Sequence, residues 1–364
     1  MPQLQELELD PPDPRRGQRV TFAQSVLALG WPFASLGMTV WLVHRAIIYA
    51  HRHGMLDQPG QRRSHTLPTP RGGGIGIVAA TLVTVPGALS SLPMAWLPSL
   101  VMSLALALAL VALVGWVDDH RPLGVLPRLG VQLLATAVFS TALLAYSESW
   151  WWLPVLVLAG TWSINLHNFM DGIDGLLAQQ LIFVAGALSL LAASVAQSAL
   201  AVAALGVAMA GLGFWFYNRS PARIFMGDVG SGSAGLLIFA MSAMLWRVDH
   251  ALLWPALILC SGFVTDASLT LASRFLRGRR WYTAHREHLY QWLVRSGASH
   301  RKSATLYLAW NLLVVLPAVL LARMSPVFAL PACLMVYTVA VATWIVGKRR
   351  CLQRTRHKER YVRP

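Results

Sequence analysis

Eleven long apolar runs divide this chain, and they limit its fold more than any other feature. A run of about 17–25 apolar residues can cross the ~30 Å hydrocarbon core of a bilayer as a helix. Because the runs are continuous and do not alternate, they predict helices and argue against the strands of a membrane barrel. The runs fall at about 21–50, 74–93, 97–117, 129–146, 150–167, 176–196, 198–217, 231–247, 251–274, 304–323 and 326–347.

The composition indicates the same class. Of the 364 residues, 56% are apolar and only 12% are charged, which is far from the composition of a soluble globular domain. The chain is therefore predicted to be an all-α, polytopic integral membrane protein. We expect about eleven transmembrane helices, with ten as the alternative count.

The positive charges of the loops orient these helices. One set of segments holds 24 of the 30 Lys and Arg residues, whereas the opposite loops hold two, Arg247 and Arg323. The positive-inside rule places the rich set in the cytoplasm, so the N-terminus is predicted outside and the C-terminus inside. The predicted division is a polar tail (1–20), a membrane domain (21–347) with cytoplasmic loops 51–73, 118–128, 168–175, 218–230 and 274–303, and a basic cytoplasmic tail (348–364).

The net charge of +15 is explained by this orientation and by attraction to anionic lipid. Nucleic-acid binding requires a folded basic domain, and the chain has no segment of that kind. We therefore expect the membrane, and not a nucleic acid, as the large partner of the protein.

Five of the fifteen carboxylates lie in three short loops, and all three loops fall in the predicted cytoplasmic set. The assignment used only Lys and Arg, so this agreement is independent of it. Carboxylates beside glycines at a membrane edge indicate a metal ion and phosphates. The five are Asp118, Asp119, Asp171, Asp174 and Asp228.

Asp118 and Asp119 end the third run. Adjacent carboxylates repel each other, and acids at a helix C-terminus oppose the helix dipole. Their placement therefore predicts a contact with Mg²⁺ or a base for an incoming phosphate. The alternative is a pair that simply faces water.

Asn168, Asp171 and Asp174 follow the fifth run at three-residue spacing. Gly172 and Gly175 favour a tight turn with exposed backbone N–H groups. Asp174 has a second interpretation, as the N-cap of the next helix. That interpretation leaves Asn168 and Asp171 unexplained.

The segment Gly227-Asp228-Val-Gly230-Ser231 precedes the eighth run. Glycines and a hydroxyl before a helix N-terminus predict an anion cradle, in which Mg²⁺ would join Asp228 to phosphate oxygens. Phe225 would stack on a base or anchor the loop at the membrane interface.

Three further features carry polar groups. His285 and His288 share a helical face beside arginines, which suits a pyrophosphate; an interfacial helix is the alternative.

Arg71, in the Pro- and Gly-rich first cytoplasmic loop, would supply a cation for substrate phosphates. Asp266 lies inside the ninth run, ~12 Å deep, and is either a functional carboxylate or a brace paired with an arginine.

In this order, the motifs resemble the bacterial polyprenyl-phosphate N-acetylhexosamine-1-phosphate transferases, also called glycosyltransferase family 4. The resemblance spans residues 40–300 and rests on 68–74, 118–119, 168–175, 227–231 and 285–291. The sequence His-Arg-Glu-His at 285–288 departs from the three consecutive histidines of the muramoyl-pentapeptide translocase. The chain is therefore more similar to the members that initiate O-antigen synthesis.

The resemblance implies a reaction at the cytoplasmic face of the bacterial inner membrane. A UDP-N-acetylhexosamine and undecaprenyl phosphate would give undecaprenyl-diphospho-sugar and UMP, with Mg²⁺ (Mn²⁺ as the alternative) and often as a homodimer. Asp228 would bind the metal, Asp118 and Asp119 would act at the lipid phosphate, and Asn168 with Asp171 would contact the diphosphate and the metal. The substrate-binding residues implied are Gly172, Asp174 and Phe225 for the uracil, His285 and His288 for the diphosphate, and the cations Arg71 and Arg121.

Other functions remain as alternatives. The peptidoglycan lipid I step is the nearest one. A nucleotide-sugar or lipid-linked-sugar transporter would place polar groups near the midplane, whereas these acids lie at the edge. A phosphotransferase of the CDP-alcohol type would carry its acids in one long motif that this chain lacks. The sequence also leaves open a single displacement or a double displacement through a phospho-aspartate.

Overall fold

The computed structural model describes residues 22–57, 68–91, 97–145, 149–280 and 285–362. The predicted tail 1–20 and residues 58–67 of the loop predicted to be cytoplasmic (51–73) lie outside these residues. The described chain consists of helices joined by short loops, with one antiparallel pair, β1 (Leu56–Asp57) and β2 (Thr69–Pro70). The helices are α1 (Phe22–His53), α2 (Ile75–Ser91), α3 (Pro98–His120), α4 (Val125–Leu144), α5 (Leu153–Phe169), α6 (Leu176–Ser194), α7 (Ser198–Asn218), α8 (Asp228–Val248), α9 (Leu253–Leu276), α10 (Leu289–Arg295), α11 (His300–Trp310), α12 (Leu316–Met324) and α13 (Pro326–Val362).

The prediction of an all-α polytopic membrane protein is confirmed. Within the described residues, nine helical segments are long and apolar enough to cross a membrane. The helices α2 and α5 are shorter, with 17 residues each. Each of the eleven predicted runs coincides with a helix, and the tenth run is α11 joined to α12 through a π-helical turn at Asn311–Val315.

Helix α8 forms the centre of the bundle, because 94% of its most apolar 18-residue stretch is buried. It packs against α3 and α5. Small residues permit this close approach, because a Cβ at Gly115 would lie 2.5 Å from the carbonyl oxygen of Asp228. A Cβ at Gly235 would lie 2.5 Å from the carbonyl oxygen of Ser163. Helices approach closely in membranes through such small residues.

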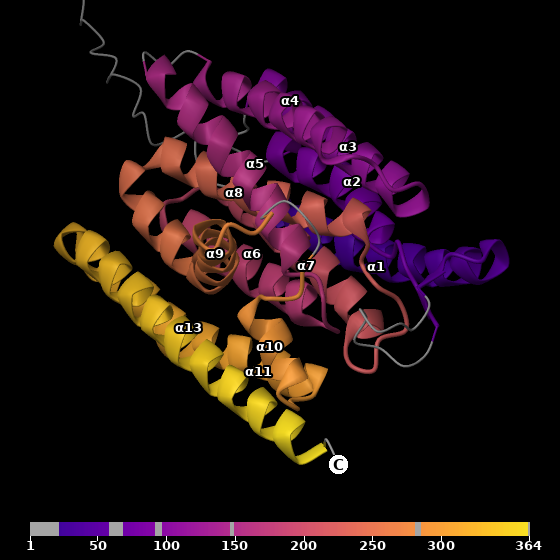
Figure 1. Cartoon of the computed structure of the whole chain (residues 1–364). Helices are drawn as coiled ribbons and strands as arrows, with labels where there is room; N and C mark the ends of the chain where they lie inside the picture. The colour runs from indigo at the N-terminus through magenta and orange to yellow at the C-terminus, as the bar shows by residue number, and fades with distance from the viewer. Residues whose placement is uncertain (1–21, 58–67, 92–96, 146–148, 281–284, 363–364) are drawn as a thin grey trace, which may run out of the picture.

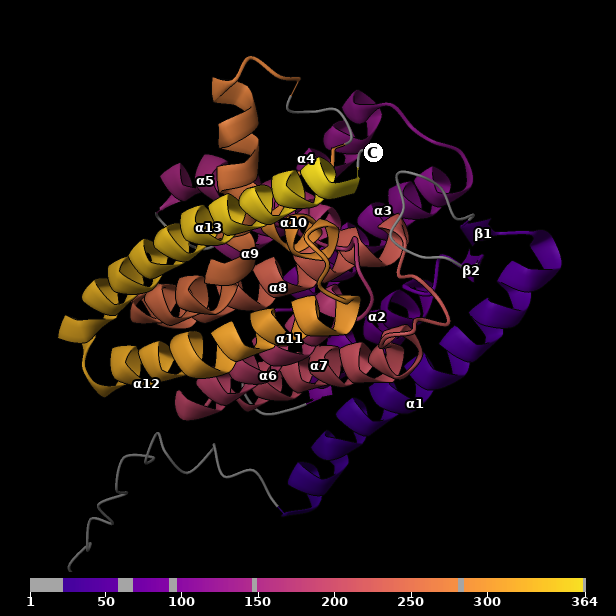
Figure 2. The ribbon, with the colours of Figure 1, turned by 60° about the horizontal axis from the view of Figure 1, so that its bottom comes forward.

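The remaining helices surround this centre in two groups. Helices α1, α2 and α7 pack together on one side, and α9, α12 and α13 pack together on the other. Figures 1 and 2 show α1 and α13 on opposite sides of the bundle. The short helix α10 packs against α13 and α11, and α11 packs against α6.

The predicted basic tail continues the last helix of the structure. It is not a separate segment, because α13 continues through Val362 without a break. Lys and Arg have high helix propensity, and no proline or glycine lies between Gly347 and the end of the helix. The positive residues that follow the last apolar run therefore extend a single long helix.

Candidate active site

The C-terminal ends of α3 and α5 meet the N-terminal end of α8. Arg128, in the first turn of α4, lies between two carboxylates. Its Nη1 atom donates to Oδ2 of Asp118 at 2.6 Å and lies 3.4 Å from Oδ2 of Asp228. Asn168 Nδ2 donates to the hydroxyl of Ser231 at 3.1 Å. Three of the predicted site segments therefore lie side by side.

Asp119 points away from its neighbour and into the start of α8. Its Oδ1 accepts the backbone N–H of Asp228 at 3.0 Å, and its Oδ2 accepts that of Val229 at 3.1 Å. Arg71 Nη2 donates to the same Oδ1 at 2.8 Å, and the Asp119 side chain is only 1% exposed. This carboxylate therefore stabilises the first turn of α8, as an N-capping acid does.

This arrangement corrects the predicted anion cradle. The N–H groups of Asp228 and Val229 are bonded to Asp119, and those of Gly230 and Ser231 donate to the carbonyl of Gly227 at 3.1 and 3.0 Å. A substrate phosphate would have to displace a buried carboxylate to reach the end of α8. The prediction that the turn itself binds a phosphate is therefore wrong.

The loop between α1 and α2 contacts this turn through its backbone. Gly73 N–H donates to the carbonyl of Phe225 at 2.9 Å, and Gly74 N–H donates to that of Met226 at 2.8 Å. A Cβ on Gly74 would lie 2.3 Å from the Cα of Gly230, so only a glycine fits at this crossing. The loop thereby brings Arg71 to Asp119, and the structure pairs this arginine with a carboxylate.

Asp118 is the member of the acid pair that faces the shared site. Its Oδ1 accepts the backbone N–H of Leu123 at 2.5 Å, and its Oδ2 binds Arg128. Arg121 is exposed, and no ion pair from it to an acid occurs among the described residues. Sequence reasoning missed Arg128, the last residue of the predicted loop 118–128, although a cation ten residues after Asp118 was a signal that could have found it.

Asp171 has the least compensated carboxylate of the site. In the described part of the chain it makes no side-chain hydrogen bond or ion pair, whereas its backbone N–H donates to the carbonyl of Asn168 at 3.3 Å. Burial and then the negative charges of Asp228 and Asp119 raise the pKa of Asp171 well above its usual range, with Arg71 opposing them. A cation beside this carboxylate would relieve that penalty.

The donor set suits a magnesium ion that arrives with a phosphate substrate. Among the residues described, no group of three or more His, Cys, Asp or Glu side chains could hold a metal ion. Mg²⁺ is usually bound by one or two carboxylates together with substrate phosphates and waters. Asp228 and Asp171 supply two carboxylates and Asn168 supplies an amide oxygen at the same helix ends. These residues are enough to bind Mg²⁺ together with a substrate phosphate.

Asp174 has partners of its own. Its Oδ1 lies 3.1 Å from His300 Nδ1, and its Oδ2 accepts the backbone N–H of Ala222 at 3.3 Å. Burial opposes ionisation of Asp174, but these two partners outweigh it and lower its pKa. The alternative interpretation as a helix cap is wrong, because Gly175, with φ of 75°, is the N-cap of α6.

A polar cavity of about 550 Å³ lies next to Asp174 and Gly175. Its wall includes Trp215 and the cations Arg219, Arg223 and Arg301, whereas Phe225 does not line it. Gly172 lies instead against Tyr290, so a Cβ there would be 2.1 Å from the tyrosine hydroxyl. The cavity offers an aromatic face and positive charge within one space.

The two histidines lie against the Asn168–Asp171 turn. The ring of His288 is 2% exposed and stacks on Phe169 at a centroid distance of 6.1 Å, and the His285 ring is 4.9 Å from that of His288. Tyr290 Oη donates to the carbonyl of Phe169 at 2.9 Å. Burial is the main cause that lowers the pKa of both histidines, to about 4 for His285. Both imidazoles are therefore neutral at physiological pH.

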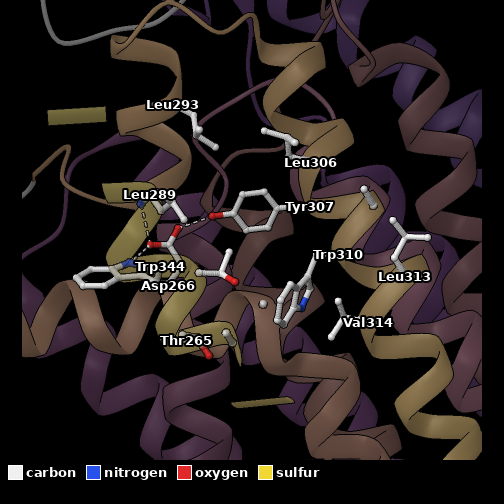
Figure 3. Close-up of a pocket in the computed structure, with 15 residues that line it drawn as sticks. Thr265, Asp266, Leu289, Leu293, Leu306, Tyr307, Trp310, Leu313, Val314 and Trp344 are labelled. Carbon is white, nitrogen blue, oxygen red and sulfur yellow. Dashed lines mark hydrogen bonds between the residues drawn. The ribbon is translucent and has the colours of Figure 1, made fainter. Parts of the chain in front are cut away.

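Asp266 braces four helices, as one of the two interpretations expected, but without an arginine. Its carboxylate accepts hydrogen bonds from Leu289 N–H at 2.8 Å, Tyr307 Oη at 2.7 Å and Trp344 Nε1 at 3.0 Å (Figure 3). The residue is 2% exposed. It borders an apolar cavity of about 390 Å³ whose walls include Trp310 and Leu313. Neutral donors suffice to stabilise this carboxylate.

Comparison with known proteins places the chain among membrane transferases. The model of the family described as "Glycosyl transferase family 4" matches residues 101–246. The chain is 30% identical to the decaprenyl-phosphate N-acetylglucosaminephosphotransferase of Mycolicibacterium smegmatis, over 72% of this chain and 74% of that protein. It is 28% identical to a probable undecaprenyl-phosphate N-acetylglucosaminyl 1-phosphate transferase of Bacillus subtilis, over 69% and 72%. It is 35% identical to the phospho-N-acetylmuramoyl-pentapeptide-transferase of Moorella thermoacetica, over 50% and 64%.

Proposed function

The chain belongs to glycosyl transferase family 4, and on this premise we propose that it transfers an N-acetylhexosamine 1-phosphate from a UDP-sugar to undecaprenyl phosphate, releasing UMP. The observation that carries the proposal is that Arg128 joins Asp118 and Asp228 at the helix ends where Asn168 bonds Ser231. The Asp171 carboxylate, which has no side-chain partner within the described chain, feels the charge of Asp228. Acids at the ends of membrane helices suit a reaction between a soluble donor and an acceptor that stays in the bilayer.

The reaction is a displacement at phosphorus. An oxygen of the lipid phosphate forms a bond to the β-phosphorus of the donor, the bond from that phosphorus to the bridging oxygen breaks, and UMP leaves with the electron pair. Such transfers need positioning and charge neutralisation more than covalent assistance. Mg²⁺, held by Asp228, Asp171 and Asn168, would neutralise phosphate charge when bound.

The protein's own groups have separate tasks in this proposal. Arg128 holds Asp118 in place and offers a cation to the lipid phosphate. At neutral pH a phosphate monoester, with a second pKa near ~6, is already mostly dianionic. Asp118 therefore orients the acceptor, and a strong base is unnecessary. Asp119 acts only through α8 and is a positioning residue.

The donor is best accommodated between the cavity beside Asp174 and the two histidines. Trp215 offers a face for stacking, and Arg219, Arg223 and Arg301 offer charge to phosphates. His285 and His288 lie next to the turn that carries Asp171, which suits the diphosphate. A uracil contact with Phe225 and a phosphate contact with Arg121 stay predictions.

The pathway is proposed to be the first membrane step of O-antigen or another cell-envelope polysaccharide. The names of the mycolicibacterial and Bacillus relatives favour an N-acetylglucosamine donor. The Moorella relative favours the peptidoglycan lipid I step as the second candidate. The protein is a multi-pass membrane protein, and we propose that it lies in the bacterial inner membrane with its site on the cytoplasmic face.

One experiment tests the activity and separates the two donors. Membranes containing the protein are incubated with undecaprenyl phosphate, Mg²⁺ and UDP-N-acetylglucosamine labelled in the sugar, and then with the labelled muramoyl-pentapeptide donor. We expect label in the lipid phase and release of UMP with the first donor. Release of UDP, or transfer that persists with a chelator, would refute the mechanism. Transfer from the second donor alone would establish the lipid I step instead.

A further inference from the structure

Asn218, the last residue of α7, lies between two of the acid-bearing segments. It is only 3% exposed. Its Oδ1 accepts the backbone N–H of Gly175 at 2.9 Å, and its Nδ2 donates to the backbone carbonyl of Ile224 at 2.9 Å. The second bond closes the connection between α7 and α8 onto itself, and the first bond ties this connection to the turn before α6.

The two backbone groups that Asn218 holds are close in sequence to two carboxylates of the acid site. Gly175 follows Asp171 by four residues, and Ile224 precedes Asp228 by four residues. Gly175 is the N-cap of α6, so its N–H has no acceptor within that helix and the Asn218 amide supplies one. The side chain therefore joins the segment that carries Asp171 to the segment that carries Asp228.

The connection between α7 and α8 has further contacts along its length. Ala222 N–H donates to Oδ2 of Asp174 at 3.3 Å, and Phe225 N–H donates to the carbonyl of Pro70 at 2.8 Å. These bonds hold single points of the connection. Asn218 is different because one buried side chain bonds to both backbone segments at once.

The chemistry of this bridge requires an amide. A side-chain amide has an acceptor oxygen and a donor nitrogen on the same carbon, so it can satisfy an N–H and a carbonyl together. Ionised aspartate has the same shape but only accepts, and leucine has a similar shape but does neither. Because its oxygen and its nitrogen both bond to backbone groups, Asn218 acts on the backbone and not on a substrate.

We propose that Asn218 is a positioning residue of the transfer reaction, which sets the placement of Asp171 relative to Asp228 by joining the backbone segments that carry them. This rests on the proposed function for the identity of the reaction, whereas the bridge itself does not. Groups that act together in a site must be held within about 0.5 Å of their working geometry. A buried bridge four residues from each carboxylate supplies such a restraint.

The first test measures the bridge without substrate. Hydrogen–deuterium exchange of the purified full-length protein is followed in the peptides that contain Gly175 and residues 219–227. Asn218→Leu removes both hydrogen bonds at nearly constant shape, so exchange should become about 10-fold faster or more in both peptides. Unchanged exchange in either peptide would overturn the proposal.

The matched control removes another buried amide. Asn311 is 1% exposed, and its Nδ2 donates to Oε1 of Gln180 at 2.7 Å. Its side chain makes no hydrogen bond to either acid-bearing segment within the described chain. Asn311→Leu should therefore leave exchange in both peptides at the wild-type rate. Equal acceleration in this variant would show that the two peptides report only a general loss of stability, and would overturn the proposal.

The pH dependence of the transfer reaction separates positioning from a general loss of stability. In Asn218→Asp, a protonated carboxyl group can accept from Gly175 and donate to Ile224, whereas the carboxylate can only accept. Burial raises the pKa of such a group, which brings its titration toward the assay range. The kcat of Asn218→Asp relative to wild type should therefore rise about 10-fold or more from pH 9 to pH 6, and the same ratio for Asn311→Asp should stay constant. A ratio for Asn218→Asp that does not change with pH would overturn the proposal.

Kinetics of Asn218→Leu distinguish this proposal from the proposed function. We expect kcat to fall about 10- to 100-fold, with the KM of each substrate within a few fold of the wild type. Wild-type kcat in this variant would refute the positioning role and leave the proposed function intact. Absence of transfer by the wild-type protein would refute the proposed function, while the exchange measurements still decide whether Asn218 joins the two segments.

Discussion

The carboxylate of Asp119 accepts the backbone N–H of Asp228 at 3.0 Å, so one acid of the site completes the first turn of the helix that begins with another. Asp118, the residue before it, faces Arg128 instead. Two adjacent carboxylates of the same helix end thus have different tasks. Asp119 supports the protein fold, and Asp118 faces the space where a substrate would lie.

We expect Asp119→Ala to destabilise the protein more than Asp118→Asn does. Removal of the Asp119 carboxylate leaves two buried N–H groups and Arg71 without their acceptor, which should cost about 1–3 kcal/mol. Asp118→Asn keeps an acceptor for Leu123 and should mainly lower kcat. Thermal unfolding of both variants in detergent, alongside transfer assays, checks the contrast. Equal loss of stability in the two variants would contradict it.

Asp228→Asn should lose turnover by roughly two to three orders of magnitude while it still inserts and folds, because a proposed metal ligand is lost. Mg²⁺ should raise the melting temperature of the wild type but not of this variant. The matched control is Asp249→Asn at the other end of α8, whose carboxylate accepts a hydrogen bond from Ala251 N–H and from no other group among the described residues. We expect that control to retain both activity and the response to Mg²⁺. Full activity of Asp228→Asn would remove the metal assignment.

Asp171→Asn should stabilise the metal-free protein at neutral pH, by on the order of 1 kcal/mol. The pKa of Asp171 is raised in the folded state, so folding favours its protonated form. The wild-type protein therefore loses stability as the pH rises from the ordinary pKa of an aspartate through the raised pKa of Asp171. The Asp171→Asn variant has no carboxylate at this position and does not show that loss. Melting temperatures recorded with a chelator from about pH 4 to pH 8 should diverge toward the alkaline end. Parallel curves would show that the Asp171 carboxylate is compensated.

Gly172→Ala should inactivate the protein through a clash with Tyr290. The new Cβ would lie 2.1 Å from the tyrosine hydroxyl, which itself donates to the carbonyl of Phe169. Overpacking of this kind costs about 1–3 kcal/mol. Tyr290→Phe removes the nearest atom, so the double variant should regain part of the activity and stability lost by Gly172→Ala. A double-mutant cycle measures the coupling, and strict additivity would show that the two positions do not interact.

Several features could be predicted from the sequence because they depend on short-range patterns. Each of the eleven continuous apolar runs coincides with a helix or with two joined helices, because the bilayer sets the length of such runs. The loops with Asp118, Asn168 and Asp228 were expected on one side of the membrane, and the structure brings these residues together. Fold class and the meeting of these loops therefore follow from hydropathy and charge.

Other features depend on helix rotation and on distant partners, which one sequence does not encode locally. Whether Asp118 or Asp119 faces α8 is decided by the rotation of α3. Asp174 finds its partner in His300, 126 positions further along the chain. One of the two interpretations of Asp266 paired it with an arginine, but three neutral donors from separate helices meet it instead.

The crossing of Gly74 and Gly230 has a consequence for how such a site can change during evolution. A Cβ at Gly74 would lie 2.3 Å from the Cα of Gly230, and a Cβ at Gly230 would lie 2.5 Å from the Cα of Gly74. Each residue already has the smallest side chain, so no second substitution can make room for the first. The two positions therefore have no path of compensating change, and they should remain fixed as a pair where side chains around them diversify.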